Sequence, residues 1–143
     1  MPDIGGVERP YHSRKAILVL DDEPVVMRVY RVALGGKGYT IIEASSAAQA
    51  HQRFQENWRN LDLVIADLGL PDGSGVEVAL AFWSESPNLR IIITSGYPPS
   101  MWRDQDASTF EKLLPDAAVL LKPFFPAKLI KVVEAMIGPP QQA

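Results

Sequence analysis

Polar residues that could do chemistry stand directly after short apolar runs of this sequence. The acids DDE occupy 21–23, and Asp67 follows the run LVIA. Two hydroxyls, Thr94 and Ser95, end a later run, and Lys122 ends the last one. Each of them alone is better explained as a helix cap, a turn former or a surface residue. Brought together, they would make a site of three or four carboxylates, a hydroxyl and an ammonium.

Such a site has a definite chemistry. Carboxylates held close together repel one another, and burial adds to the cost, so they need a cation. Oxygen ligands with room for water suit Mg²⁺, which commonly completes its shell with phosphate oxygens. Lys122 and a hydroxyl would then bind a dianionic phosphoryl group, and Asp67 is placed as the nucleophile that receives it.

The elements that must bring these residues together are five apolar runs: 16–20, 40–44, 61–66, 90–94 and 117–121. They alternate strictly with helical patterns, which predicts a parallel sheet covered by helices on both faces. Right-handed crossovers make a doubly wound sheet the natural topology. Because the carboxyl ends of parallel strands share one edge of the sheet, the polar residues after the runs should be neighbours.

We expect five helices between and after these strands. Pro24 and Pro126 stand at first helical positions, and Ser45 or Ser46 offers an N-cap. The segment 98–114 is predicted as one helix, although two prolines at its start blur the period. The expected core face of the first helix carries four aliphatic residues at helical spacing: Val25, Val29, Val32 and Ala33.

Length and composition limit the possible functions. The 143 residues suffice for one domain with its own core. The net charge of −3 argues against nucleic acid as a direct partner, because phosphate binding needs a basic surface. The absence of cysteine excludes disulfides and thiolate sites. No stretch approaches the ~20 apolar residues of a membrane helix, so we expect a cytoplasmic protein without a membrane partner.

The two ends differ in composition from the rest of the chain. Residues 1–14 are predicted to form a flexible N-terminal arm and residues 138–143 a C-terminal tail, which leaves 15–137 as the domain. Neither end is long enough for an effector domain, so we expect a single-domain protein. A piece cut from a longer protein remains an open alternative.

Four motifs, in this order, carry a resemblance to a known family: LVLDDEP, DLGLPDGSG, TSGY and LLKPF. Together they resemble the receiver domain of bacterial two-component response regulators, and the likeness covers about residues 15–137. The resemblance implies a flavodoxin-like α/β fold, with five parallel strands in the order 2-1-3-4-5 and five helices. It also implies a signalling switch that catalyses only its own phosphotransfer and dephosphorylation.

The resemblance assigns the acidic residues. Asp67 would be the phospho-acceptor and would take its phosphoryl group from a phosphohistidine of a histidine kinase or a histidine phosphotransfer protein. Asp22 would bind Mg²⁺ directly, and Asp21 mainly through water. Asp67 itself and the backbone carbonyl of Gly69 would complete the protein ligands.

The resemblance also assigns the phosphoryl-binding groups. Lys122 would bind a phosphoryl oxygen and hold the acidic pocket closed. The switch hydroxyl aligns with Ser95, because the family places a small residue next, here Gly96. Thr94 is the second candidate, since its hydroxyl directly ends the apolar run.

One position departs from the family pattern. Three residues before the lysine, where the family usually carries an inward-turning Tyr or Phe, this sequence has Val119. Tyr97 or Trp102 is therefore our hypothesis for the moving aromatic. The family's signalling face, built from its fourth helix, fifth strand and fifth helix, would here include Trp102, Phe125 and Lys128, and would bind an unknown protein target or form a homodimer.

The main prediction is thus a Mg²⁺-dependent phosphorelay switch. Two alternatives remain open, a receiver-like docking module that is not phosphorylated and a receiver excised from a hybrid histidine kinase. A flavin carrier would need a phosphate-cradling loop after the first strand, where this chain has repelling acids. A phosphatase with an aspartate nucleophile would need a second acid at the position of Gly69.

Overall fold

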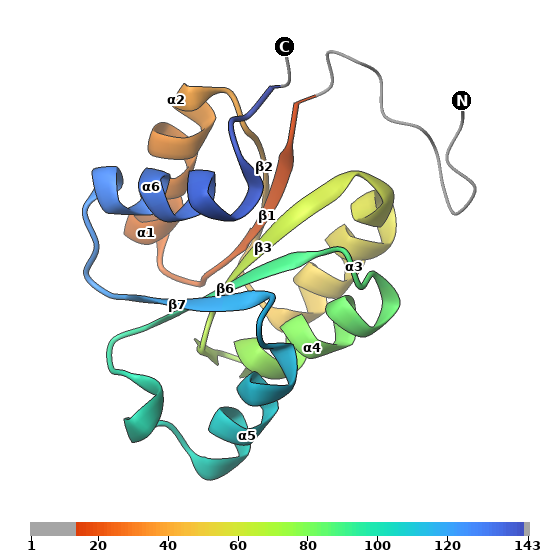
Figure 1. Cartoon of the computed structure of the whole chain (residues 1–143), viewed down its shortest axis with the longest axis vertical. Helices are drawn as coiled ribbons and strands as arrows, with labels where there is room; N and C mark the ends of the chain where they lie inside the picture. The colour runs from red at the N-terminus through yellow and green to blue at the C-terminus, as the bar shows by residue number, and fades with distance from the viewer. Residues whose placement is uncertain (1–13, 142–143) are drawn as a thin grey trace.

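A single parallel sheet forms the centre of the computed structural model, which describes residues 14–141 (Figure 1). Its strands are β1 (Ala16–Leu20), β2 (Thr40–Ala44), β3 (Leu61–Asp67), β6 (Arg90–Ser95) and β7 (Ala117–Leu121). They lie in the order β2-β1-β3-β6-β7, which confirms the predicted order 2-1-3-4-5. Two strands are one residue longer than expected, so Asp67 and Ser95 close β3 and β6. A short antiparallel hairpin, β4 (Gly69–Leu70) and β5 (Gly73–Ser74), follows Asp67.

Four helical segments connect the strands of the sheet and a fifth follows the last strand, as predicted. The first begins as α1 (Pro24–Val29), passes through a π-helical turn (Tyr30–Leu34) and ends as α2 (Gly35–Lys37). The others are α3 (Ala47–Asn57), α4 (Gly75–Glu85), α5 (Asp104–Leu113) and α6 (Pro126–Ile137). The prediction of one helix over 98–114 was wrong at its start. Pro98 is extended and Pro99–Met101 makes a separate 3₁₀ turn, so α5 begins only at Asp104.

The helices cover both faces of the sheet, with α1, α2 and α6 on one side and α3, α4 and α5 on the other (Figure 1). Alternate strand residues enter the two cores, as the period of a β-strand requires. Ile65 and Ile92 pack in the core under α1 and α6. Ala66 and Ile93 pack in the core under α3, α4 and α5. This alternation decides toward which face each polar residue at the strand ends is directed.

The first helix has a different core face from the expected one. Val25 and Val32 are 76% and 63% exposed. The buried positions are Met27, Tyr30 and Leu34, also at helical spacing. The prediction was wrong for Val25 and Val32, whereas Val29 and Ala33 are partly buried against this core. Aliphatic residues occur on both sides of this helix, so their spacing alone does not select the buried side.

The two ends of the described chain meet beside β1. The Lys15 backbone N–H donates to the carbonyl of Pro140 at 2.7 Å, and the Tyr39 hydroxyl donates to that of Gly138 at 2.6 Å. The described part of the predicted tail, 138–141, is thus hydrogen-bonded to the domain. The predicted arm, 1–14, lies outside the described residues except for Arg14. Between 14 and 141, no helix is long and apolar enough to cross a membrane.

Two local contacts hold the loop after Asp67. The Asp72 carboxylate accepts hydrogen bonds from the first backbone N–H groups of α3, those of Ala47 at 2.7 Å and Ala48 at 3.0 Å, and so caps that helix. Gly75, the first residue of α4, packs against the end of β3. A Cβ atom on Gly75 would lie 1.9 Å from the carbonyl oxygen of Asp67. Only glycine therefore allows α4 to approach the strand end this closely.

We predict that Gly75→Ala destabilises the fold by about 3 kcal/mol or more, because backbone cannot yield to the added methyl group as a flexible side chain can. Urea unfolding measures this change. Gly36→Ala is the matched control: its Cβ would meet nothing within 4 Å, and we expect a stabilisation of roughly 0.5–1 kcal/mol. Equal effects of the two substitutions would contradict the close approach.

Candidate functional site

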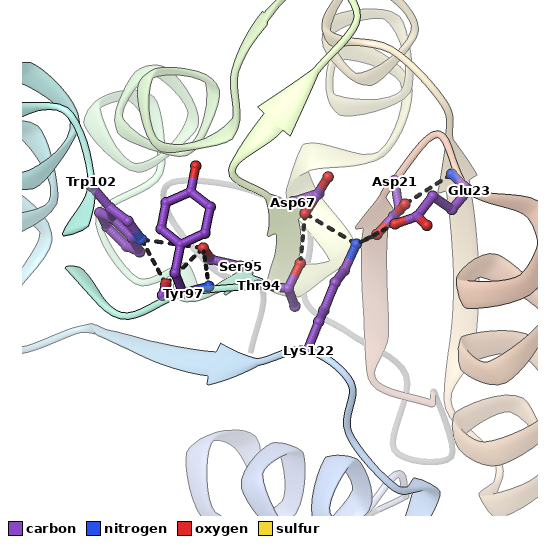
Figure 2. Close-up of polar contacts among 8 residues, drawn as sticks. All are labelled: Asp21, Glu23, Asp67, Thr94, Ser95, Tyr97, Trp102 and Lys122. Carbon is purple, nitrogen blue, oxygen red and sulfur yellow. Dashed lines mark hydrogen bonds and ion pairs between the residues drawn. The ribbon is translucent and has the colours of Figure 1, made fainter. Parts of the chain in front are cut away.

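A lysine at the carboxyl edge of the sheet is surrounded by acids (Figure 2). The Nζ of Lys122 lies 2.7 Å from Asp21 Oδ2, 2.8 Å from Glu23 Oε1 and 3.1 Å from Asp67 Oδ1. Asp21 and Glu23 follow β1, Asp67 ends β3, and Lys122 follows β7. The sequence-predicted gathering of these groups at one edge is what the structure shows, although they come from three strands separated by up to 101 positions.

The two candidate hydroxyls lie on opposite faces of β6. Thr94 pairs in register with Asp67 of β3, and its hydroxyl donates to Asp67 Oδ1 at 3.4 Å, a long bond. The Ser95 hydroxyl points away from Asp67 (Figure 2). It donates to the carbonyl of Tyr97 at 2.8 Å and accepts from the Trp102 indole at 3.2 Å. Ser95 therefore faces away from the acid in this structure, because strand alternation directs neighbouring residues to opposite sides.

The predicted signalling residues do not form one surface. Trp102 is buried, with its ring edge against Phe110 at a centroid distance of 5.4 Å, so it is no exposed docking residue. Val119 packs against the same core. Phe125 is 81% exposed and Lys128 is exposed as well. The expected aromatic surface reduces to Phe125, while Trp102 belongs to the interior beside Ser95.

Charge and burial have opposing effects on the pKa of Asp67 and on that of Lys122. Burial raises the pKa of the Asp67 carboxyl, the Lys122 ammonium opposes that shift, and the Asp21 carboxylate adds to it. Burial alone would lower the pKa of Lys122. Its hydrogen bonds to Asp21 and Glu23 outweigh burial and raise that pKa well above the ordinary value. Lys122 therefore keeps its positive charge, whereas ionisation of Asp67 costs more here than it does in water.

The acid cluster has the composition of a magnesium site. Asp21, Asp22 and Asp67 each offer one carboxylate oxygen, and these three oxygens lie within 4.8 Å of one another. The Asp22 side chain is exposed and accessible to an ion from solvent, whereas Asp21 is buried. Gly69, the expected carbonyl ligand, is exposed at the start of β4. Oxygen-only donors of this kind fit Mg²⁺. The residues present therefore fit the metal that the sequence implied.

Gly96 and Tyr97 complete the loop after β6. A Cβ on Gly96 would meet nothing within 4 Å, so steric crowding does not explain a small residue here. Tyr97 is 46% exposed, and it lines a cavity of about 420 Å³ beside the β4–β5 hairpin. Both residues leave space for movement of this loop.

One residue close to the site was not expected there from its sequence pattern. Tyr30, from the π-helical turn, is fully buried, and its hydroxyl has no hydrogen-bond partner within the described chain. An unpaired buried hydroxyl costs ~1–3 kcal/mol. The signal in the sequence would have been a tyrosine at a core position of the first helix, which the valine stripe concealed.

The family found by comparison with known proteins agrees with the fold described above. The sequence profile of the response regulator receiver domain matches residues 17–134. The chain belongs to this family. It is a receiver domain of two-component signalling, with the flavodoxin-like fold predicted from the four motifs.

Several known proteins are similar to this chain. It is 30% identical to the response regulator receiver protein CpdR of Brucella abortus over 124 residues, which are 86% of this chain and 97% of that protein. It is 44% identical to the transcriptional regulatory protein KdpE of Mycobacterium tuberculosis over 73 residues, half of this chain but only 31% of KdpE. The structure of the response regulator protein TrrA from Thermotoga maritima, in complex with Mg²⁺ and BeF, matches with a TM-score of 0.70 and 30% identity, covering 85% of this chain and 98% of that one.

We predict that Asp67→Asn raises the melting temperature of the metal-free receiver, because a neutral amide removes the cost of burying the Asp67 charge, which together with the repulsion from Asp21 outweighs the attraction of Lys122. Relief of about 1 kcal/mol would raise it by roughly 2–4 °C. Mg²⁺ should raise the melting temperature of the wild type more than that of the variant, since the variant lacks one ligand. Thermal melts with and without Mg²⁺ measure both effects.

Asp104→Asn, outside the acid cluster, is the control for removing one negative charge. It should leave the Mg²⁺ effect at the wild-type value. A Mg²⁺ effect of equal size in all three proteins would contradict a metal site that includes Asp67.

Proposed function

We propose that this receiver is a phosphorylation switch whose acceptor is Asp67 and whose phosphotransfer depends on Mg²⁺. One observation supports this above all: the partly buried Asp67 carboxylate lies beside Lys122, and its oxygen lies within 4.8 Å of an oxygen of each of two further carboxylates. The donor is a phosphohistidine of a histidine kinase or a histidine phosphotransfer protein, which is the partner class of the family. The proposal extends the family assignment to particular residues.

The transfer balances in atoms and electrons. One oxygen of the Asp67 carboxylate attacks the phosphorus, and the new O–P bond forms as the P–N bond to the imidazole breaks. The imidazole nitrogen keeps the bonding electron pair and takes a proton. Asp21, Asp22 and Asp67 would hold Mg²⁺, which when bound supplies positive charge to the phosphoryl oxygens.

Lys122 connects the chemistry to the rest of the molecule. It is shared among Asp21, Glu23 and Asp67 before phosphorylation. A phosphoryl group brings a charge of about −1.5 to −2 to Asp67, so it competes for this ammonium with the carboxylates that now hold it. The Lys122–Glu23 pair is the weakest competitor, because the Glu23 side chain is exposed. We propose that Lys122 transfers from Glu23 to a phosphoryl oxygen.

Ser95 is the proposed switch hydroxyl, and switching must break the hydrogen bonds that it makes in this structure. To reach the phosphoryl group it has to leave the Tyr97 backbone and the Trp102 indole. The buried Trp102 indole donates to the Tyr97 carbonyl as well, at 3.0 Å, and we propose that its ring reorients when Ser95 leaves this network. With Val119 in place of the usual aromatic, Trp102 supplies the moving ring. The changed surface, which includes Phe125 and Lys128, would bind a downstream protein or a second copy of the receiver.

We predict that a small-molecule phosphodonor adds one phosphoryl group to the wild-type protein in the presence of Mg²⁺, because the donor needs only the site itself. Intact-mass measurement detects the addition. Asp67→Asn should gain nothing, and chelation of Mg²⁺ should abolish the gain in the wild type. No gain in the wild type would overturn the proposal in favour of a docking module that is not phosphorylated.

We predict that beryllofluoride with Mg²⁺ changes the fluorescence of Trp102, because Ser95 gives up the indole for the analogue. The change should disappear in Trp102→Phe, which assigns it among the three tryptophans, and in Ser95→Ala. Thr94→Val should keep it. An unchanged signal in a wild-type protein whose melting temperature shows that the analogue is bound would contradict this read-out.

A further inference from the structure

A hydrogen bond between two side chains joins the loop after Asp67 to helix α5. The Ser74 hydroxyl donates to Asp106 Oδ1 at 2.8 Å. Ser74 ends the β4–β5 hairpin, where it pairs with Gly69, and Asp106 is the third residue of α5. Both side chains are partly buried, so water competes less for this bond than on an open surface. The hairpin is thus fastened to α5, as Asp72 fastens it to α3.

The start of α5 has space beside it. Residues of the β4–β5 hairpin and of the segment 97–106 line a common cavity of about 420 Å³. Ser74 and Asp106 both belong to this lining, together with Gly69 and Tyr97. On this side the first turn of α5 therefore borders open space rather than close-packed side chains, so it can move once the Ser74–Asp106 bond breaks.

The two ends of α5 are held in different ways. Asp116 follows its C-terminal end and is tied to the sheet, because its backbone carbonyl accepts a hydrogen bond from β6 at 3.0 Å. The Asp116 carboxylate also accepts from the Trp83 indole of α4 at 3.1 Å. At the N-terminal end, the side chain of the N-cap residue Arg103 makes no capping bond, and the first turn is held by the Ser74–Asp106 bond. A displacement of α5 would therefore be largest at its N-terminal end.

The buried Trp102 connects this end of α5 to Ser95. It lies two residues before α5, its indole donates to the Ser95 hydroxyl, and its ring packs edge-on against Phe110 of α5. In the proposed function this ring reorients when Ser95 leaves. Because side chains in a core are closely packed, a reoriented ring requires the first turns of α5 to move as well. The hairpin is held by α3 and α4, so this movement stretches the Ser74–Asp106 bond.

Both groups have other partners when this bond breaks. The Ser74 hydroxyl also accepts from the backbone N–H of Val76 at 3.2 Å, so it remains the N-cap of α4. Asp106 lies in the first turn of α5, where free backbone N–H groups and the helix dipole favour a carboxylate. Neither group would be left buried without a partner, so the bond can open at a small cost in free energy.

We propose that the Ser74–Asp106 bond is a latch, which holds the start of α5 against the β4–β5 hairpin and opens when Asp67 is phosphorylated. The proposal rests on the proposed function, which supplies the movement of Ser95 and Trp102. A contact that exists only in the unphosphorylated state opposes phosphorylation, and by linkage its removal favours phosphorylation. The latch thus couples the acceptor loop to α5 and keeps α5 in place until the site is occupied.

Asp106→Ala tests the latch, and Asp104→Ala is its matched control. Both substitutions remove one carboxylate from the first turn of α5, but Asp104 is exposed and lies outside the latch. We expect Asp106→Ala to bind beryllofluoride with Mg²⁺ roughly fivefold more tightly than the wild type, the size expected for one hydrogen bond. Asp104→Ala should keep the wild-type affinity. An NMR titration measures the three affinities.

Two outcomes of this titration would overturn the latch. Equal affinities in all three proteins would show that the bond does not oppose occupation. Weaker binding by Asp106→Ala would show that the bond is kept in both states and only positions the hairpin.

Ser74→Gly breaks the same bond from its other side, and it costs little as an N-cap because glycine is tolerated there. It should tighten the binding of beryllofluoride to a similar extent. The double variant with Asp106→Ala should bind no more tightly than either single variant, since both remove one interaction. Fully additive gains would refute the latch, because they would show that the two side chains act separately.

The state without a ligand is tested by amide hydrogen exchange in the metal-free protein. Asp106→Ala should speed exchange at the start of α5, beginning with Ala107, whose N–H donates to the Arg103 carbonyl at 3.0 Å. Asp104→Ala should change it less, and equal exchange in the two variants would overturn the latch. A wild type that binds no beryllofluoride would instead refute the proposed function and with it the opening step, whereas the exchange rates would still decide whether the bond holds α5.

Discussion

The balance between Lys122 and the carboxylates at the sheet edge is the constraint on which the rest of the site depends. Asp21 is buried, and ions in such places are stable only when paired. Lys122 supplies the pairing from a different strand end, and so ties β7 to β1 and β3. The same arrangement leaves the acids with more negative charge than one ammonium can neutralise. That surplus favours a bound cation, and in the proposed function an incoming phosphoryl group would compete with the carboxylates for Lys122.

Contacts of the backbone around Asp67 fix the position of its carboxylate relative to Lys122. Gly75 lets α4 approach the acceptor residue closely, and Asp72 fastens the intervening hairpin to α3. Loops at the carboxyl edge of a parallel sheet commonly carry the chemistry while the sheet supplies rigidity. In this receiver the loop after Asp67 is held at both ends, whereas the loop after Ser95 has an exposed tyrosine and space around Gly96. The backbone at Asp67 is therefore held in place, whereas the loop that carries the proposed switch has space around it.

The two hydroxyls of β6 lie on opposite faces of the sheet and make different contacts. Thr94 lies on the side of Asp67 and Tyr30, and Ser95 on the side of Trp102. One strand position thus separates the Thr94–Asp67 contact from the Ser95–Trp102 contact, which is the one that the proposed switch would break. The missing aromatic at Val119 is compatible with this division, because Trp102 already packs in the core beside Ser95. Motif spacing alone could not show it, since both hydroxyls belong to the same TSGY motif.

The sequence by itself determined the strand–helix alternation and the gathering of the acids with Lys122, because these follow from hydrophobic runs and from the shared edge of parallel strands. The order of the strands came from the resemblance that the four motifs carry. Only the tertiary structure decided the orientation of side chains and the buried face of the first helix. It directs the Ser95 hydroxyl away from Asp67, and it buries Trp102 in one core and Tyr30 in the other. The physical reason is that a run of apolar residues specifies an element, whereas the face that each residue occupies depends on packing against elements distant in the sequence.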